Sequence, residues 1–302
     1  MSMVSVLGLL FALTFYPSDV LSRLSARQKF RQELSDTREV DRPDHRPIGR
    51  GLTHLWTTPV LRETLVGPEC EIPTDLLTCI ENAVLRRFRA FSRTLDLTSR
   101  PLSDKGETIN DRFFEMQRDA WEAGGPSFLD ETVSSGGDCE ELELEVLAFR
   151  ALRAAWLDRI YTFMSKAASV DVADAMFASM QLFVWASVHE AESAHVAHDH
   201  ENAAVSGVFY ISTPPHSGSI RFEDPRVARL YWAESPFNPA PLAHSPTAGE
   251  LLLFPPWLIH SVGSSKGASA PRVSLSFNVL TPRVGSEDLT ALVNSAVLVP
   301  TS

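Results

Sequence analysis

Residues 195–212 read His-Val-Ala-His-Asp-His-Glu-Asn-Ala-Ala-Val-Ser-Gly-Val-Phe-Tyr-Ile-Ser. The apolar, β-branched second half predicts a strand over 205–212. In the first half, His198 and His200 stand two residues apart, and residues two apart in a strand point to the same side. Asp199, between them, would then point to the opposite side. We expect the two histidines to face a common space and the aspartate to turn away from it.

A later apolar run, Phe254-Pro-Pro-Trp-Leu-Ile-His260, ends in a third histidine, and Arg272-Val-Ser274 follows. Histidine is the commonest metal-binding side chain. Arginine binds carboxylates through paired hydrogen bonds, and Ser274 would share its side of a strand. The pattern predicts a mononuclear metal site beside an anion-binding group. Five of the other histidines carry no such spacing and are expected to be structural or solvated: His54, His189, His195, His216 and His244.

The C-terminal half consists of short apolar or alternating runs separated by Pro, Gly and Ser, a texture typical of a sandwich or double-sheet barrel. Helical periodicity is confined to the N-terminal half. We therefore expect an α+β protein, with a double-stranded β-helix (jelly-roll) core buttressed by N-terminal helices. The expected strands are 182–188, 205–212, 219–222, 250–254, 257–262 and 272–280, with an edge strand over 52–60.

Three helices are expected in the N-terminal half. The first opens at Pro73 and buries Leu76, Leu77, Ile80, Val84, Leu85, Phe88 and Phe91; its arginines 86, 87, 89 and 93 are expected on a solvated face. A short helix is expected over 111–123. A long one, 138–166, would bury Leu147, Leu152, Trp156, Ile160 and Phe163.

The chain divides by composition. The apolar run 4–15 has the length of a signal-peptide core, so residues 1–22 are a candidate signal or targeting segment. Charge-mixed residues 23–50 are expected to form a disordered linker. A single folded domain is expected over 51–285, with helical support at 72–180 and the jelly-roll core at 181–282. Residues 286–302 would form a C-terminal tail.

Composition bounds the function and the compartment. The net charge of −11, without a cluster of basic residues, argues against nucleic-acid binding. Three cysteines without paired spacing, and no Asn-x-Ser/Thr sequon, favour a reducing compartment and hence the cytoplasm. The apolar run 4–15 keeps secretory or organellar targeting open.

Several motifs occur together in order: Trp185-Ala-Ser-Val, His198-x-His200, Ser206-Gly-Val-Phe-Tyr210, Phe222-Glu-Asp-Pro-Arg226, Gly249 to His260, and Arg272-Val-Ser-Leu-Ser-Phe-Asn278. In this order they resemble the 2-oxoglutarate and Fe(II)-dependent oxygenases with an H-x-H motif, a branch related to prolyl 4-hydroxylase. The resemblance is dense from Trp185 to Leu280 and thinner at Leu55 to Val60.

The resemblance implies an oxidoreductase, a dioxygenase that uses O2 to oxidise a C–H bond of an unknown substrate and releases succinate and CO2. It implies Fe(II) held by His198, His200 and His260. It also implies the co-substrate 2-oxoglutarate, held by Arg272, Ser274 and Tyr210. Trp185 and Asn278 would line the barrel without an assigned role.

The chain departs from the usual pattern where His200 replaces an acidic ligand, and Glu201 stands where a proline is common. Three neutral imidazoles leave the site one negative charge short. Two alternatives therefore stay open: a three-histidine cupin-like dioxygenase without 2-oxoglutarate, and a non-catalytic jelly-roll binding protein. The substrate could be a small molecule or a peptidyl residue, reached past a proline-rich loop at 235–241. A homodimer is also compatible with the sequence.

Overall fold

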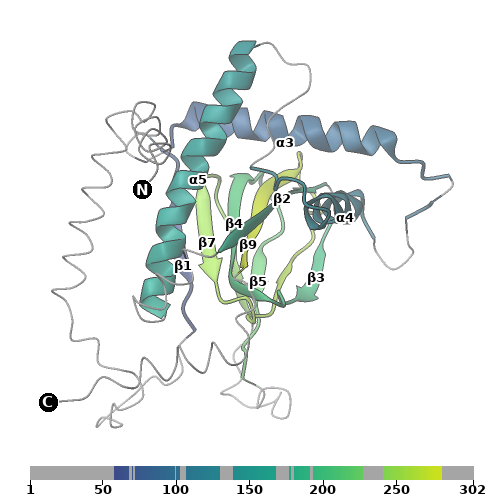
Figure 1. The fold of residues 1–302 in the computed structure, drawn as a ribbon. Helices are drawn as coiled ribbons and strands as arrows, with labels where there is room; N and C mark the ends of the chain where they lie inside the picture. Colours follow the sequence, from purple (N-terminus) through teal and green to yellow (C-terminus); the bar gives the residue numbers. More distant parts are fainter. Residues whose placement is uncertain are drawn as a thin grey trace, which may run out of the picture. The chain divides into compact units, whose positions relative to one another are not determined.

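Two antiparallel sheets form the C-terminal half of the computed structural model (Figure 1). The larger has the order β1-β7-β4-β9-β2, formed by Leu61–Thr64, Glu250–Phe254, Ala203–Ser212, Arg272–Leu280 and Gln181–His189. The smaller has the order β3-β8-β5-β6, formed by His195–His198, His260–Val262, Ile220–Phe222 and Leu242–His244. Helices and antiparallel strands thus coexist as the sequence predicts.

The structure describes residues 58–280 except 68–69, 71, 99, 103–106, 130–138, 168–176, 178–179, 191–192 and 227–240. All of these belong to one of the two units into which the chain divides, Thr58–Ser302. The apolar run 4–15, the linker 23–50, the loop 235–241 and the tail 286–302 lie outside the described residues, so their predictions are untested. Among the helices described, none has the length and apolarity to cross a membrane.

The chain passes repeatedly between the two sheets. From β2 to β9 each successive strand lies in the other sheet, except for β5 and β6, which pair with each other. The inner faces of both sheets share one small apolar cluster, in which Phe222 of β5 meets Phe254 of β7 at 5.2 Å between ring centroids. The two sheets therefore pack face to face, and the strand ends that carry the histidines are brought together.

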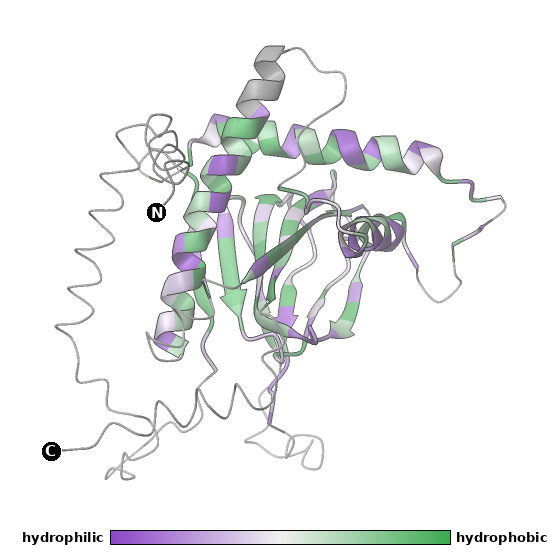
Figure 2. Ribbon diagram, in the orientation of Figure 1, coloured by the Kyte–Doolittle hydropathy of each residue, from purple (hydrophilic) through white to green (hydrophobic). Residues whose placement is uncertain are grey.

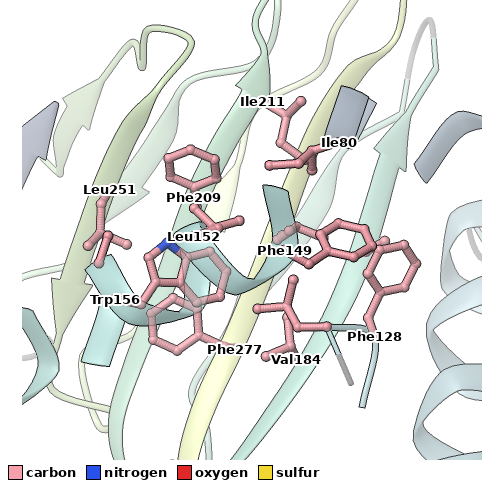
Figure 3. Close-up of a cluster of buried hydrophobic side chains, with 14 of the residues drawn as sticks. Ile80, Phe128, Phe149, Leu152, Trp156, Val184, Phe209, Ile211, Leu251 and Phe277 are labelled. Atoms are coloured by element: carbon pink, nitrogen blue, oxygen red, sulfur yellow. The ribbon is translucent and has the colours of Figure 1, made fainter. Parts of the chain in front are cut away.

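Helices α3 (Thr74–Thr94) and α5 (Cys139–Ala167) cover the outer face of the large sheet (Figure 1). The strands of that sheet are largely hydrophobic, whereas the helices alternate between hydrophobic and hydrophilic residues, as expected for helices with one buried face (Figure 2). Trp156 of α5 stacks on Phe277 of β9, with 4.4 Å between ring centroids and 25° between planes (Figure 3). Aromatic burial of this kind makes the outer cluster the main core of the described fold.

Gly207 allows this close packing. It lies on the outer face of β4, opposite Phe277 in the sheet register. A Cβ atom added at Gly207 would lie 2.3 Å from Cζ of Phe277 and 2.8 Å from Cδ2 of Leu253. The absence of a side chain here lets the aromatic ring lie flat over the strand.

Helix α4 (Ile109–Glu122) covers the free edge of β2. Its side-chain amides replace the missing neighbour strand: Asn110 Oδ1 accepts from the backbone N–H of Val188 at 2.7 Å, and Gln117 Oε1 accepts from that of Ala186 at 2.8 Å. Gln117 Nε2 also donates to the carbonyl of Ala186 at 3.0 Å. These bonds satisfy backbone groups that an exposed edge would leave open, and they fix α4 beside the strand.

The predicted helices are confirmed to within two residues at their ends, and most predicted strands are confirmed. The prediction for Leu147 is wrong, because this residue is 57% exposed and Phe149 is buried on α5 in its place. The expected strand over 257–262 shortens to His260–Val262, because Pro255 and Pro256 precede a turn closed by Leu258 N–H and the Pro255 carbonyl. The described edge strand β1 spans Leu61–Thr64, after Pro59, while residues 52–57 of the predicted edge strand lie outside the described residues.

Three of the four arginines of α3, at positions 86, 89 and 93, are exposed as predicted, whereas Arg87 is partly buried. Arg86 and Arg87 both pair with the carboxylate of Glu145, which is buried on α5. The Arg87 guanidinium also lies over the ring of Phe128, 4.4 Å from its centroid. These two arginines therefore join α3 to α5.

Candidate metal centre and anion pocket

The three predicted histidines come together at the paired ends of β3 and β8. His198 lies directly opposite His260 in the antiparallel register. His200 follows β3, and its backbone N–H donates to the carbonyl of Pro256 at 3.0 Å. Both histidines of the His-x-His motif are therefore bonded to the segment 256–260, which ends in His260.

The side chains converge closely enough to bind one ion. One nitrogen from each of His198, His200 and His260 lies within 4.8 Å of the other two. Within the described part of the chain this is the one group of three or more metal-ligating side chains with such geometry. Imidazole nitrogens bind divalent metals at about 2.0–2.1 Å, so small rotations of the rings suffice to enclose an ion.

The ring hydrogen bonds indicate which nitrogen is available in two of the histidines. Nδ1 of His198 lies 2.9 Å from the carbonyl of Val196, and Nδ1 of His260 lies 2.9 Å from the carbonyl of Leu258. A carbonyl only accepts, so each Nδ1 carries the proton and each Nε2 keeps a free lone pair. These two rings are held in the tautomer that a metal requires.

The environment keeps three histidines of the site neutral, namely His195, His200 and His260. Burial, reinforced by the neighbouring histidines, lowers the pKa of His200 to about 3 and that of His260 to about 4. Burial also lowers the pKa of His195 to about 4. Uncharged imidazoles are the metal-binding form, so no proton has to be displaced from these rings at neutral pH.

Arg272 forms a buried positive group on the inner face of β9. It is 2% exposed, and its Nη1 donates to the carbonyl of Gly218 at 3.0 Å. Its Nε has no hydrogen-bond partner, and no carboxylate among the described residues lies within ion-pairing distance. A buried cation without a counter-charge is costly, so the site is suited to an anionic ligand.

Ser274 and Tyr210 lie beside Arg272, as predicted. They face each other across the β4–β9 pairing, and both are almost completely buried. The Arg272 guanidinium lies 5.7 Å from the centroid of the Tyr210 ring. Burial raises the pKa of the Tyr210 phenol, so the hydroxyl stays protonated and can donate a hydrogen bond.

One cavity, of about 280 Å³, joins the histidine group to this anion pocket. The three histidines, Arg272, Ser274 and Tyr210 all line it. Trp185, expected in the barrel interior, lines it too, with 6.0 Å between its ring centroid and that of His200. Asp199 also lines this cavity, so the prediction that it turns away from the histidines is wrong, because β3 ends at His198 and strand alternation does not extend to residue 199. Asp199 is exposed and lies outside the three-histidine group.

The sequence did not reveal the contribution of α4. Asp111 and Phe114 line the cavity from this helix. Asp111 Oδ2 accepts from the backbone and hydroxyl of Thr108 in a capping box, which is a sufficient local reason for an acidic residue at that position. The prediction for His189 and His195 also missed their place on the cavity wall; the ring of His195 lies 4.4 Å from that of His198, though outside the group of three.

These features define a candidate metal centre of three histidines beside a buried arginine that is suited to an anion. Comparison with known proteins agrees with this class: residues 183–278 match the family model described as "Putative 2OG-Fe(II) oxygenase". This segment is thus similar to 2-oxoglutarate and Fe(II)-dependent oxygenases, which are oxidoreductases. No curated protein sequence matches the chain.

Solved structures of low sequence identity also align. A prolyl-4-hydroxylase from Pseudomonas putida is 14% identical, with 75% of this chain and 89% of that chain covered and a TM-score of 0.37. The dioxygenase for auxin oxidation 1 from Arabidopsis thaliana is 11% identical, with 75% and 84% covered and a TM-score of 0.42. A prolyl hydroxylase from Trichoplax adhaerens is 12% identical, with 78% and 87% covered and a TM-score of 0.40.

Proposed function

We propose that this oxygenase hydroxylates a C–H bond of a small-molecule or peptidyl substrate, using O2 and converting 2-oxoglutarate to succinate and CO2. The observation that carries the proposal is the buried Arg272 without a counter-anion, which shares a cavity with three converging histidines. The family match from residue 183 to 278 supports the same chemistry.

The fold that we propose around this site is a double-stranded β-helix. Alternation of successive strands between two antiparallel sheets, with polar residues lining a cavity between them, supports this description. Such a core places ligands from several strand ends around one space.

We assign the metal to His198, His200 and His260. Fe(II), when bound, supplies O2 activation and the oxidation of the substrate. The protein's own part is to hold three imidazole nitrogens together and to direct Nδ1 of His198 and of His260 at backbone carbonyls.

We assign the distal carboxylate of 2-oxoglutarate to Arg272, with hydroxyl hydrogen bonds from Ser274 and Tyr210. A guanidinium binds a carboxylate through two parallel N–H groups, and the unpartnered Nε of Arg272 supplies one such donor. A carboxylate ligand to the metal is absent from the histidine group, so the dianionic co-substrate has more positive charge to neutralise here than in a two-histidine, one-carboxylate site.

The test is succinate formation by protein loaded with Fe(II) under anaerobic conditions and then given 2-oxoglutarate, O2 and a panel of peptides and small molecules. We expect succinate release that needs Fe(II) and is abolished in His260→Ala. Failure of every panel member to raise succinate above the metal-free background would contradict the proposal.

A second measurement separates this proposal from a three-histidine dioxygenase that uses no 2-oxoglutarate. Binding of 2-oxoglutarate to Mn(II)-loaded protein is measured by calorimetry for the wild type and Arg272→Met. We expect saturable binding that weakens strongly in the variant. Substrate oxidation that proceeds without 2-oxoglutarate would favour the other enzyme class.

A further inference from the structure

The third histidine, His200, differs from the other two in what its ring contacts. His198 and His260 each direct Nδ1 at a carbonyl two residues earlier in the chain. His200 instead directs Nδ1 at the side chain of Asn278, with 3.3 Å between Nδ1 and the amide Nδ2. The residue that stands where a carboxylate ligand is usual therefore has a side-chain partner of its own.

Asn278 is held from its other side by a buried serine. The Ser206 hydroxyl donates to Oδ1 of Asn278 at 2.8 Å, and the two residues are directly opposite in the β4–β9 pairing. The sheet register thus aligns Ser206, Asn278 and His200 in one short chain of hydrogen bonds. In this arrangement the amide nitrogen donates to Nδ1 of His200, which places the ring proton on Nε2.

That arrangement does not suit metal binding through Nε2, because a protonated nitrogen has no lone pair for the ion. A half-turn of the carboxamide exchanges its oxygen and nitrogen with almost no change in shape. The oxygen then accepts from Nδ1–H of His200, and the nitrogen donates to the Ser206 oxygen. Both heavy-atom separations, 3.3 Å and 2.8 Å, lie within or close to hydrogen-bonding distance in either orientation.

We propose that Asn278 is a positioning residue for the metal centre, whose amide oxygen fixes His200 with its proton on Nδ1 and its Nε2 toward the ion. The proposal rests on the proposed metal centre and extends it by a residue that touches neither metal nor co-substrate. A carboxylate ligand has no tautomer to set. With His200 in that position, the chain needs a group that selects one tautomer, and the backbone carbonyls that serve His198 and His260 do not serve His200.

The residue type fits the task. An amide can donate or accept by turning, so it accommodates the ring both without and with a metal. Partners that orient ligating histidines are typically worth about 10–100-fold in metal affinity. Asn278 also lies on the same face of β9 as Arg272, so this one strand would orient a metal ligand at one end and hold the co-substrate at the other.

The test is Zn(II) binding by calorimetry in the full chain, for the wild type, Asn278→Leu, Asn278→Asp and Ser276→Ala. Leucine keeps the approximate shape and removes both hydrogen bonds, and we expect Zn(II) affinity to fall by about 10–100-fold. Aspartate keeps the acceptor and should bind Zn(II) at least as tightly as the wild type. Ser276, on the same face and two residues earlier, is the matched control and should leave the affinity unchanged.

A spectroscopic readout addresses the tautomer directly. In ¹⁵N-histidine-labelled, Zn(II)-loaded wild type, the ring nitrogens of His200 should show a proton on Nδ1 and the metal on Nε2. Equal Zn(II) affinity of wild type and Asn278→Leu, or ligation of His200 through Nδ1, overturns the role of Asn278 while leaving the metal centre intact. A wild type that binds no Zn(II), Mn(II) or Fe(II) overturns the metal centre itself. Were Asn278→Leu not to fold, Asn278→Asp and the wild-type spectrum decide the question.

Discussion

The two faces of strand β9 differ in almost every respect. Its outward residues are apolar, completely buried and packed under the helices: Val273, Leu275, Phe277 and Val279. Its inward residues are polar and lie on the side of the cavity: Arg272, Ser274, Ser276 and Asn278. One strand therefore contributes to the core with one set of alternate residues and to the candidate site with the other.

The two faces of β9 therefore contribute to different free energies, the outward face to folding and the inward face to ligand binding. The outward residues lower the free energy of the folded state by removing apolar area from water. Two of the inward residues, Arg272 and Ser274, hold polar groups that a ligand would satisfy, at a cost to the empty protein. Substitutions on opposite faces should therefore change stability and ligand binding independently.

The largest effect is expected on the outward face. Phe277→Ala removes the ring that stacks on Trp156 and should lower the free energy of unfolding by about 3–5 kcal/mol. Urea unfolding followed by tryptophan fluorescence measures this loss. The affinity of the folded fraction for 2-oxoglutarate should stay close to that of the wild type, and a large change in that affinity would break the separation of the two faces.

A substitution on the inward face should weaken ligand binding without lowering the stability of the metal-free protein. Arg272→Met removes charged hydrogen bonds worth about 1.5–3 kcal/mol, so the Kd for 2-oxoglutarate should rise by roughly 10–100-fold. The metal-free variant should be as stable as the wild type or more stable, because it no longer buries an unpaired charge. A stability loss as large as that of Phe277→Ala would show that Arg272 is mainly a core residue.

Acid should lower the stability of the metal-free protein through the histidines that line the cavity. The pKa values of His195, His200 and His260 are lowered to about 4, 3 and 4 by burial, whereas the unfolded value is near 6.5. The unfolded chain therefore binds protons first, and the metal-free protein should lose stability as the pH falls from about 6.5 toward 4. Urea midpoints at neutral pH and at about pH 5 measure this, and His260→Ala should show a shallower dependence. A midpoint that rises on acidification would contradict the neutral state of these rings.

The smallest effect is expected for Ser274→Ala. Loss of one hydroxyl hydrogen bond of about 1 kcal/mol should raise the Kd for 2-oxoglutarate by roughly fivefold. Calorimetry with Mn(II)-loaded protein is sensitive enough to detect this change. Ser276→Ala, which removes a hydroxyl from the same face nearer to Asn278, serves as the control, and equal effects of the two would mean that Ser274 has no special place in the anion pocket.

Much of the fold and site follows from local periodicity. Alternation along 272–280 predicts which residues point inward, and the spacing of His198 and His200 predicts their convergence. What local patterns do not contain is the register between distant segments. Asn278 acquires its partners only because β9 pairs with β4, and Asp111 reaches the cavity only because Asn110 binds Val188, far along the chain. Leu147 was misassigned for a related reason, since the helix rotation that buries Phe149 is set by α3 and the sheet.

Gly207 has a consequence that reaches beyond its own strand. The ring of Phe277 occupies the space where a Gly207 side chain would lie, and Trp156 rests on that ring. Because residue 207 has no side chain, Phe277 and the Trp156 ring of α5 can pack close to β4. The neighbours of Gly207 in the chain, Ser206 and Val208, face inward, and Ser206 is the far end of the hydrogen-bond chain to His200. An alanine at this position would have to displace either α5 or β4. Because Ser206 is next to Gly207 on β4, a shift of the strand would also move the hydrogen-bond chain to His200 on the other side of the sheet.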